Sequence, residues 1–238
     1  MGSKASLWER IMNKRMIPIG IPTLHCYNRL TRLIQSLDEQ THDCIEISFL
    51  IIDNGGNLQT SPFMQDLKQV KRPINLVVPP RNLGVSASFN AIIRHFGQCI
   101  ITGDDVTFTL EDISLLLQEA EASPDSVFVG EQEGGWTLFW MNRPDIWLSM
   151  GGFDEGFYPA YYEDNDADRR LTLAGLSRSK VVLPGWSHAN SSTLYDGTPE
   201  YQAQHWQNFH RNGMYYLQKW GGAPGQERFL TPFNGEAQ

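Results

Sequence analysis

Hydrophobic residues along this chain follow two patterns that alternate. Short runs that are almost wholly apolar predict buried strands, and longer stretches with apolar residues three and four positions apart predict amphipathic helices. In the first half the predicted elements are strands at 16–21, 45–52, 74–78 and 99–102, with helices at 28–39 and 85–96. Strands and helices that alternate at this spacing indicate an α/β fold, in which helices cover both faces of a mostly parallel sheet.

The pattern becomes less regular after residue 109. The predicted elements there are helices at 110–120, 164–174 and 199–220, and strands at 127–129, 136–141 and 180–183. No repeat, low-complexity tract or linker interrupts the chain between them. We therefore predict one continuous domain over residues 16–222, preceded by a tail or helix at 1–15 and followed by a tail at 223–238.

Composition and charge limit the kinds of protein that fit this pattern. The 238 residues are 41% hydrophobic, which is enough for a full core, and the net charge of -8 disfavours non-specific binding to nucleic acid or anionic membrane. No apolar run is long enough to span a bilayer, and the first residues lack the layout of a secretory signal, so we expect a cytoplasmic protein with no integral membrane association. Cys26, Cys44 and Cys99 have no paired spacing, which predicts reduced thiols rather than a disulfide framework or a zinc site.

Candidate ligand-binding residues follow three of the predicted strands. They are Pro22, Thr23 and Tyr27 after the first strand, Asp53 after the second, and Asp104 and Asp105 after the fourth. In open parallel sheets, ligands bind at the carboxyl ends of the strands. We therefore expect these residues to meet at one edge of the sheet.

Two of these positions also have structural explanations. The Asp-Asn-Gly-Gly segment that begins at Asp53 suits an ordinary turn. Asp104 or Asp105 would suit the amino-terminal cap of the helix predicted at 110–120, a role that Thr109 or Asp112 fills equally well. The sequence leaves these alternatives open.

The densest group of acidic residues lies in the segment 151–175. Its carboxylates are those of Glu163, Asp164, Asp166 and Asp168. They repel one another unless a metal ion, the hydroxyl groups of a bound substrate, or the guanidinium groups of Arg169 and Arg170 offset them. Asp166 and Asp168 have a simpler explanation, because negative charge in the first turn of a helix complements the helix dipole. Arg169 and Arg170 are expected to neutralise this helix, with contact to a diphosphate as the alternative.

Five motifs occur in a fixed order along the chain. They are Ile19-Gly20-Ile21-Pro22-Thr23, Ile51-Ile52-Asp53-Asn54-Gly55, Arg81-Asn82-Leu83-Gly84-Val85, Asp104-Asp105, and Gly151-Gly152-Phe153-Asp154-Glu155 with Tyr162-Glu163-Asp164. Each is weak alone, but together they resemble the family-2-type GT-A glycosyltransferases over about residues 16–190. The resemblance implies a Rossmann-like sheet, with a nucleotide-sugar-binding half at 16–109 and an acceptor-side half at 110–222. It also implies transfer with inversion at the anomeric carbon.

The resemblance assigns a set of residues to the donor nucleotide-sugar. By their places in the motifs these are Pro22, Thr23, Tyr27, Asp53, Arg81, Asn82 and Asp104. Asp53 lies where a carboxylate of the family receives the ring N–H of the base. That role suits uridine, so a UDP-sugar is favoured over a dTDP- or GDP-sugar.

The implied metal ligands depart from the family pattern at one position. Gly103 stands where the first acid of the Asp-x-Asp signature often sits, which leaves Asp105 as the principal protein ligand and Asp104 for the ribose or the donor sugar. Mn²⁺ or Mg²⁺ is expected, because oxygen ligands and a diphosphate suit these ions. His188 falls where some relatives add an imidazole to the metal, although a histidine after a Pro-Gly-Trp turn is also an ordinary structural donor.

The acidic segment then supplies the chemistry implied by the resemblance. Asp164 is expected to act as the base that takes the proton of the acceptor hydroxyl, and Glu163 to hold donor-sugar hydroxyls or orient the loop. Trp136, Tyr161 and Tyr162 are the candidates for acceptor binding. The expected function is that of a metal-dependent inverting glycosyltransferase whose acceptor is a glycan or another hydroxyl-bearing molecule, with a modified DNA base among the alternatives. A catalytically silent protein that binds a nucleotide-sugar or a glycan is the alternative function.

Overall fold

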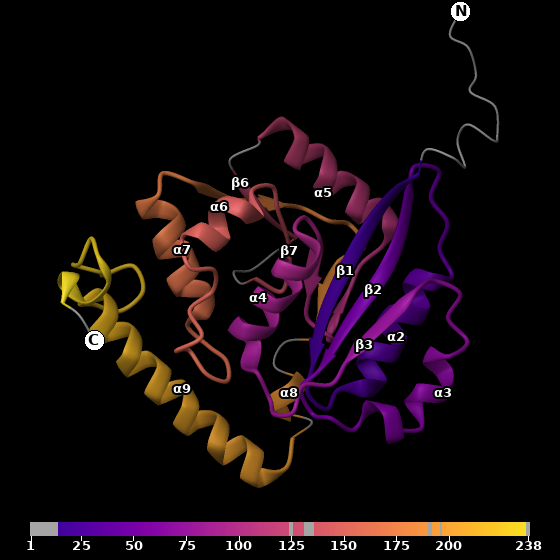
Figure 1. Ribbon diagram of the computed structural model, residues 1–238, viewed down its shortest axis with the longest axis horizontal. Helices are drawn as coiled ribbons and strands as arrows, with labels where there is room; N and C mark the ends of the chain where they lie inside the picture. The colour runs from indigo at the N-terminus through magenta and orange to yellow at the C-terminus, as the bar shows by residue number, and fades with distance from the viewer. Residues whose placement is uncertain (1–13, 124–125, 131–135, 190–191, 196, 237–238) are drawn as a thin grey trace, which may run out of the picture.

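A seven-stranded sheet forms the centre of the computed structural model of this chain (Figure 1). The structure describes residues 14–123, 126–130, 136–189, 192–195 and 197–236. Across the sheet the strands follow one another as β3 (Ile74–Val77), β2 (Ile45–Asp53), β1 (Arg15–Thr23), β4 (Ile100–Thr102), β7 (Leu138–Met141), β6 (Ser126–Gly130) and β8 (Ser177–Val181). Neighbouring strands run parallel, except that β7 is antiparallel to both β4 and β6. The predicted α/β class with a mostly parallel sheet is confirmed.

Helices cover both faces of this sheet. One face carries α2 (Tyr27–Asp38), α3 (Phe63–Leu67) and α5 (Leu110–Ala122), and the other carries α4 (Gly84–Phe96), α6 (Pro144–Ser149) and α7 (Glu163–Leu173). In α2 the buried apolar residues recur three and four positions apart, at Leu30, Leu33, Ile34 and Leu37. That spacing places them on one stripe of the helix, which packs against the sheet.

The central strands are apolar on both sides because helices bury both of their faces. Ile19 and Ile21 of β1 belong to the same buried cluster as the apolar stripe of α2. Gly20, between them, faces α4, where an added Cβ would stand 2.3 Å from Cγ2 of Ile92. Only glycine lets α4 approach β1 this closely, and this packing brings the loop before α4 to the end of β1.

Several elements differ from those predicted. The predicted strand at 180–183 lies at 177–181, and the predicted strand at 136–141 begins at Leu138. Helices α3 and α6 were not predicted, because five and six residues are too few to show a helical period. Most of the predicted segment 1–15 lies outside the described residues.

A second sheet contains only two short strands from distant parts of the chain. β5 (Val106–Thr107) pairs antiparallel with β9 (Ser187–His188), so that Val106 lies opposite His188. Two residues per strand give no periodic pattern, and neither strand was predicted. This pairing ties the segment after β4 to the segment after β8.

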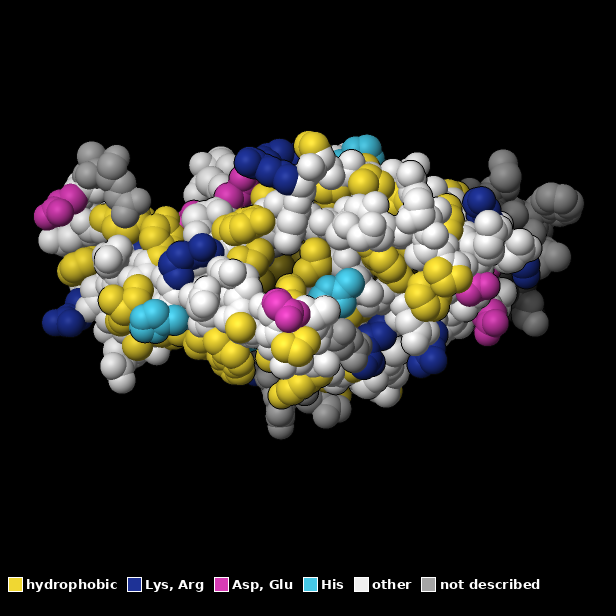
Figure 2. Space-filling model, turned by 90° about the horizontal axis from the view of Figure 1, so that it is seen from below, with side chains coloured by type: hydrophobic (Ala, Val, Ile, Leu, Met, Phe, Trp, Pro, Cys, Tyr) yellow, Lys and Arg dark blue, Asp and Glu magenta, His cyan; other side chains and the backbone are white. Residues whose placement is uncertain are grey.

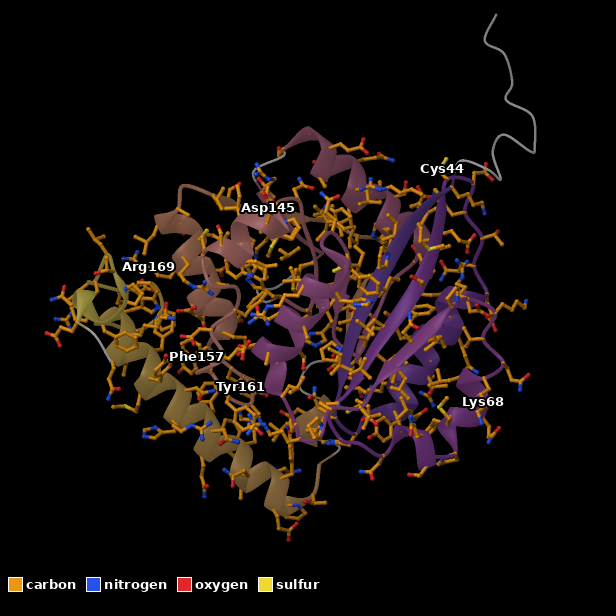
Figure 3. The ribbon with its side chains drawn as sticks, viewed as in Figure 1. Cys44, Lys68, Asp145, Phe157, Tyr161 and Arg169 are labelled. Atoms are coloured by element: carbon orange, nitrogen blue, oxygen red, sulfur yellow. The ribbon has the colours of Figure 1, made fainter. Side chains whose placement is uncertain are left out.

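The long helix α9 (Pro199–Trp220) has the predicted bounds and follows the short helix α8 (Ser192–Tyr195). The Thr198 side chain caps its start, and Gly221 ends it with a left-handed backbone conformation, which glycine adopts without strain. Near its end, Tyr216 and Trp220 pack with Phe157 in a separate apolar cluster. The carboxyl-terminal part of α9 is therefore anchored beside α7, as Figures 1 and 3 show.

Short one-turn helices at Leu58–Thr60 and Pro232–Gly235 complete the described elements. Cys26, Cys44 and Cys99 are free thiols, as predicted, and Cys26 and Cys99 are buried. Within the described part of the chain, no helix combines the length and the apolar character that a membrane crossing requires.

Candidate active site

A cavity opens where the chain connections diverge on either side of β1. β2 and β3 lie on one side of β1 and β4 lies on the other, so the carboxyl ends of β1 and β4 border a crevice of the kind that binds ligands in α/β sheets. The cavity has a volume of about 380 Å³, which is within the range of small-molecule sites. Figure 2 shows the molecule from this side, hollowed near its middle with hydrophobic side chains in its depth. Its lining includes residues from the ends of β1 and β4, from β9, from the start of α7 and from α9.

Thr23 and Asp104 join the ends of β1 and β4 at the wall of the cavity. The Thr23 hydroxyl donates a hydrogen bond of 2.6 Å to Oδ2 of Asp104, and both residues are buried. Burial raises the pKa of Asp104 to about 7. The alternative that Asp104 or Asp105 caps α5 is wrong, because Thr109 and Asp112 form a reciprocal capping box there.

Asp105 and His188 meet because β5 pairs with β9. Oδ1 of Asp105 lies 3.2 Å from Nε2 of His188. Gly103 contributes to this arrangement, since an added Cβ at this position would stand 3.0 Å from the same carboxylate oxygen, a tight contact. The glycine that replaces the first acid of the expected signature therefore leaves room for the Asp105 carboxylate.

The pair of Asp105 and His188 has donor atoms that suit a divalent cation. An octahedral ion with bonds of about 2.1 Å has neighbouring ligands roughly 3 Å apart, close to the 3.2 Å between Oδ1 and Nε2. Among the residues that the structure describes, no group of three or more His, Cys, Asp or Glu side chains is arranged to hold a metal ion. A cation at this pair would therefore take most of its ligands from outside the protein, as Mg²⁺ does when it binds substrate phosphates.

Glu163 and Asp164 begin α7 and line the same cavity. Oε2 of Glu163 is buried and has no hydrogen-bond partner among the described residues, whereas Oδ1 of Asp164 accepts a hydrogen bond of 2.8 Å from the backbone N–H of Asn165. Burial raises the pKa of both carboxyl groups, and the charge of Asp164 raises that of Glu163 further. An unpartnered oxygen and two carboxyl groups with raised pKa values are typical of a functional site.

The backbone before Glu163 is held in an unusual conformation. Tyr161 and Tyr162 have φ angles of 80° and 72°, in the left-handed region that residues with side chains seldom adopt. The buried Asn212 of α9 donates hydrogen bonds to the carbonyl oxygens of Ala160, at 2.7 Å, and Tyr161, at 3.3 Å. The last turns of α9 thus hold the loop that places Glu163 and Asp164.

Several predicted donor-binding residues lie outside the cavity lining. Asp53 is fully buried, and its carboxylate accepts hydrogen bonds from the Tyr27 hydroxyl and from the backbone N–H groups of Gly55, Gly56 and Leu58. Asp53 and Tyr27 therefore hold the turn after β2 in this structure, which agrees with the turn interpretation. Arg81 is exposed and also lies outside the lining, whereas Pro22, Thr23, Asn82 and Asp104 belong to it.

Two of the three aromatic residues predicted to bind the acceptor line the cavity. Trp136 and Tyr161 line the cavity, but Tyr162 does not and instead packs near Phe209 and Tyr216. Only 5% of Trp136 is exposed, and its Nε1 donates to Oδ1 of Asp168 at 3.0 Å. Tyr161 lies beside α9, as Figure 3 shows, and its ring centroid is 4.7 Å from that of His205.

Helix α9 supplies lining residues that were not among the predicted site residues. Tyr201, His205 and Asn208 face the cavity. They are spaced four and three positions apart, which places them on one face of the helix. The aromatic residues of this helix predicted that it packs against the sheet or borders the acceptor groove, but their spacing alone does not show which residues face the ends of the strands.

Behind the cavity, α7 and α9 share a buried network of charges. The Lys219 ammonium group lies 2.6 Å from a carboxylate oxygen of Asp154 and 2.6 Å from one of Asp166. Asp166 is fully buried and also accepts hydrogen bonds from Arg170 and from the indole of Trp220. Asp166 therefore fastens α7 to α9, a larger role than the helix-dipole interaction expected from the sequence.

The arginines of α7 also make their contacts outside the cavity. Arg169 donates to the carbonyl oxygen of Phe229 at 2.8 Å, and its guanidinium lies over Trp220. Arg170 pairs with Asp166 and lies over the ring of Trp147. Neither arginine belongs to the cavity lining, so the structure gives no support to contact with a diphosphate.

Replacing Lys219 with Met is expected to lower the free energy of unfolding by about 3 kcal/mol or more. The change leaves the buried carboxylate of Asp166 and the partly buried carboxylate of Asp154 without their shared cation, which is strongly destabilising. Chemical denaturation of the two proteins measures the difference. Lys68→Met is the matched control, because Lys68 is exposed at the end of α3 (Figure 3) and a surface substitution there changes stability by less than about 0.5 kcal/mol. Equal midpoints for the wild type and Lys219→Met would contradict the role of Lys219.

Comparisons with known proteins agree with this geometry. The family model described as "Glycosyl transferase family 2" matches residues 19–173. No curated protein sequence matches the chain. Among solved structures, a mannosyltransferase from Pyrobaculum calidifontis in complex with GDP-Man and Mn2+ is 12% identical, with a TM-score of 0.62 over 88% of this chain and 66% of that one.

Two further solved structures have the same fold. GalNAc-T7 with UDP, GalNAc and Mn2+ is 12% identical, with a TM-score of 0.59 over 87% of this chain and 50% of that one. TarS of S. aureus, residues 1–349, is also 12% identical, with a TM-score of 0.55 over 86% of this chain and 73% of that one. This chain thus spans less than two thirds of the length of the first two. The fold is the GT-A fold implied by the sequence motifs.

Proposed function

The chain belongs to glycosyl transferase family 2, and on that premise we propose that it is a metal-dependent inverting glycosyltransferase that moves a sugar from a nucleotide-sugar to an acceptor hydroxyl. The observation that carries the proposal is the cavity, which brings the acids after β4 and the acids at the start of α7 to one site. A donor with a diphosphate and a sugar would engage both groups at once. A UDP-sugar is the first candidate, and a GDP- or dTDP-sugar follows.

The nucleotide-sugar is proposed to enter at the ends of β1 and β4. Pro22, Thr23, Asn82 and Asp104 line this end of the cavity and would contact the nucleotide. The hydrogen bond between Thr23 and Asp104 supports this role, because it holds the two strand ends together at the crevice. Asp53 would act indirectly, since its buried carboxylate orders the turn that follows β2.

Asp105 and His188 are the proposed ligands of Mn²⁺ or Mg²⁺. Their separation of 3.2 Å and their oxygen and nitrogen donors support this assignment. When bound, such an ion stabilises the negative charge that develops on the leaving diphosphate. The cavity needs a positive charge for this purpose, because no Lys or Arg is found among the described residues that line it.

Asp164 is the proposed base. Its carboxylate would take the proton of the acceptor hydroxyl as the oxygen attacks the anomeric carbon, and a single displacement of this kind inverts the configuration there. The positions of Asp164 at the start of α7 and of Tyr161 just before it support an acceptor site at this end of the cavity. Tyr161 and Trp136 would contact the acceptor, which is proposed to be a glycan or another hydroxyl-bearing molecule.

Release of a nucleoside diphosphate from a nucleotide-sugar tests this proposal. The chain with Mn²⁺ is expected to release UDP from at least one of UDP-glucose, UDP-galactose and UDP-N-acetylglucosamine, and faster when a suitable glycan is added. Chromatography measures the nucleotide, and mass spectrometry identifies the glycosylated acceptor. Binding of nucleotide-sugars without any release, across these donors and the corresponding GDP- and dTDP-sugars, would favour the silent binding protein instead.

A further inference from the structure

Among the described residues that line the cavity, carboxyl groups outnumber basic side chains, which are His188 and His205. The carboxyl groups are those of Asp104, Asp105, Glu163 and Asp164. No Lys or Arg belongs to the described lining. The neighbouring stretches 131–135 and 190–191, which lie outside the described residues, contain no Lys or Arg in their sequence either. The charge of a metal ion at Asp105 and His188 would be neutralised by the diphosphate of the donor. Little of this positive charge would then be left to balance another acidic group on the bound molecule.

Glu163 marks the part of the cavity that has an unmet hydrogen bond. Oε2 of Glu163 is buried and has no partner among the described residues. A buried acceptor without a partner is unfavourable, so a bound molecule that donates a hydrogen bond there gains affinity. A sugar hydroxyl is such a donor, whereas an ionised carboxylate has no hydrogen to donate.

The position of Glu163 indicates which part of a donor would reach it. Thr23 and Asp104 lie at the strand ends, where the nucleotide is proposed to bind, and Asp105 and His188 follow at the proposed diphosphate position. Glu163 lines the same cavity from a different element, the start of α7. The group that continues from the diphosphate toward Glu163 is the transferred sugar.

We infer that the donor site selects an uncharged sugar and rejects a uronate, and that Oε2 of Glu163 accepts a hydrogen bond from a hydroxyl of the sugar. The inference rests on the proposed function, because it assumes that a nucleotide-sugar occupies the cavity. A carboxylate on the sugar would lie beside the carboxyl groups of Glu163 and Asp164, and no Lys or Arg belongs to the described cavity lining. Burial raises the pKa of both carboxyl groups, so this part of the cavity disfavours negative charge, and an added carboxylate would meet the same penalty.

Calorimetric titration of the chain with UDP-glucose and UDP-glucuronate, in the presence of Mn²⁺, tests the inference. The two ligands differ only where a CH₂OH group is replaced by a carboxylate. UDP-glucose is expected to bind at least as tightly as UDP, and UDP-glucuronate about 100-fold more weakly than UDP-glucose. Glu163→Gln removes a carboxyl group whose pKa burial raises to about 8 and keeps an acceptor oxygen, so at a pH above this value it should narrow the difference between the two ligands about tenfold. Asp168→Asn, outside the lining on the same helix, should leave the difference unchanged.

The outcomes separate the inference from the proposed function. Equal affinities for UDP-glucose and UDP-glucuronate in the wild type would overturn the inference and leave a nucleotide-sugar transferase standing. An undiminished difference in Glu163→Gln would remove Glu163 from the selection. If GDP or dTDP binds in place of UDP, the same comparison applies to the neutral sugar and the uronate of that nucleotide. If none of the three nucleotides binds, the proposed function fails and the inference fails with it.

Discussion

Replacing Asp164 with Asn is expected to slow sugar transfer by about 100-fold or more, while binding of the nucleotide stays unchanged. Asn has nearly the same shape but cannot take the proton of the acceptor hydroxyl. Asp164 lines the cavity at the start of α7 and does not belong to the nucleotide end at β1 and β4. Release of the nucleoside diphosphate, with and without acceptor, measures the rate, and calorimetric titration with the nucleotide measures binding.

The pH dependence of the wild-type transfer rate also tests Asp164 as the base. Burial raises the pKa of Asp164. A base acts only when deprotonated, so the rate should fall as the pH drops through this raised pKa, at a higher pH than the value of about 4 usual for aspartate.

Asp168→Asn is the matched control for Asp164→Asn. Asp168 lies one turn further along α7, where its carboxylate contacts Trp136 and Arg178 instead of the cavity. This variant should keep most of the transfer rate. Unchanged transfer in Asp164→Asn, or equal losses in the two variants, would remove Asp164 from the role of base.

Replacing Asp105 with Ala is expected to reduce nucleoside diphosphate release by at least about 100-fold at a fixed concentration of Mn²⁺. The change removes the only carboxylate of the pair that it forms with His188. The remaining imidazole should bind the ion weakly, so a higher concentration of Mn²⁺ should recover part of the rate. Initial rates across a series of Mn²⁺ concentrations measure both effects.

Chelation and a distant substitution serve as controls for this result. EDTA should abolish the wild-type activity, and added Mn²⁺ should restore it. Asp66→Ala makes the same change on the exposed side of α3, outside the cavity lining, and should keep the wild-type response to Mn²⁺. Turnover that survives both Asp105→Ala and chelation would show that the metal assignment is wrong.

Most of the fold was predictable because the central elements are strongly patterned. β1 and β2 are apolar on both faces, and α2 and α4 carry regular apolar stripes, so a local reading of the sequence found all four. β8 was misplaced because it lies at the edge of the sheet, where its polar residues 177–180 are tolerated. The apolar residues that follow gave a misleading signal, since Val182 is 74% exposed.

The candidate site was predictable where its residues follow strands directly. Thr23 and Asp104 end neighbouring parallel strands, and the parallel arrangement alone brings them to the same edge of the sheet. The role of Asp53 was harder to judge, because a turn and a ligand site both favour an aspartate at that position. The hydrogen bonds to its carboxylate in the structure agree with the turn.

The sequence by itself determined the α/β class, the family, and the acids at the strand ends and in segment 151–175. These features depend on periodicity and on short motifs, which are local. Only the tertiary structure decided that His188 meets Asp105, that Lys219 supports α7 from behind, and that α9 closes the cavity. Each of these contacts joins segments far apart in the chain, and hydrophobic periodicity alone does not show which distant faces pack together.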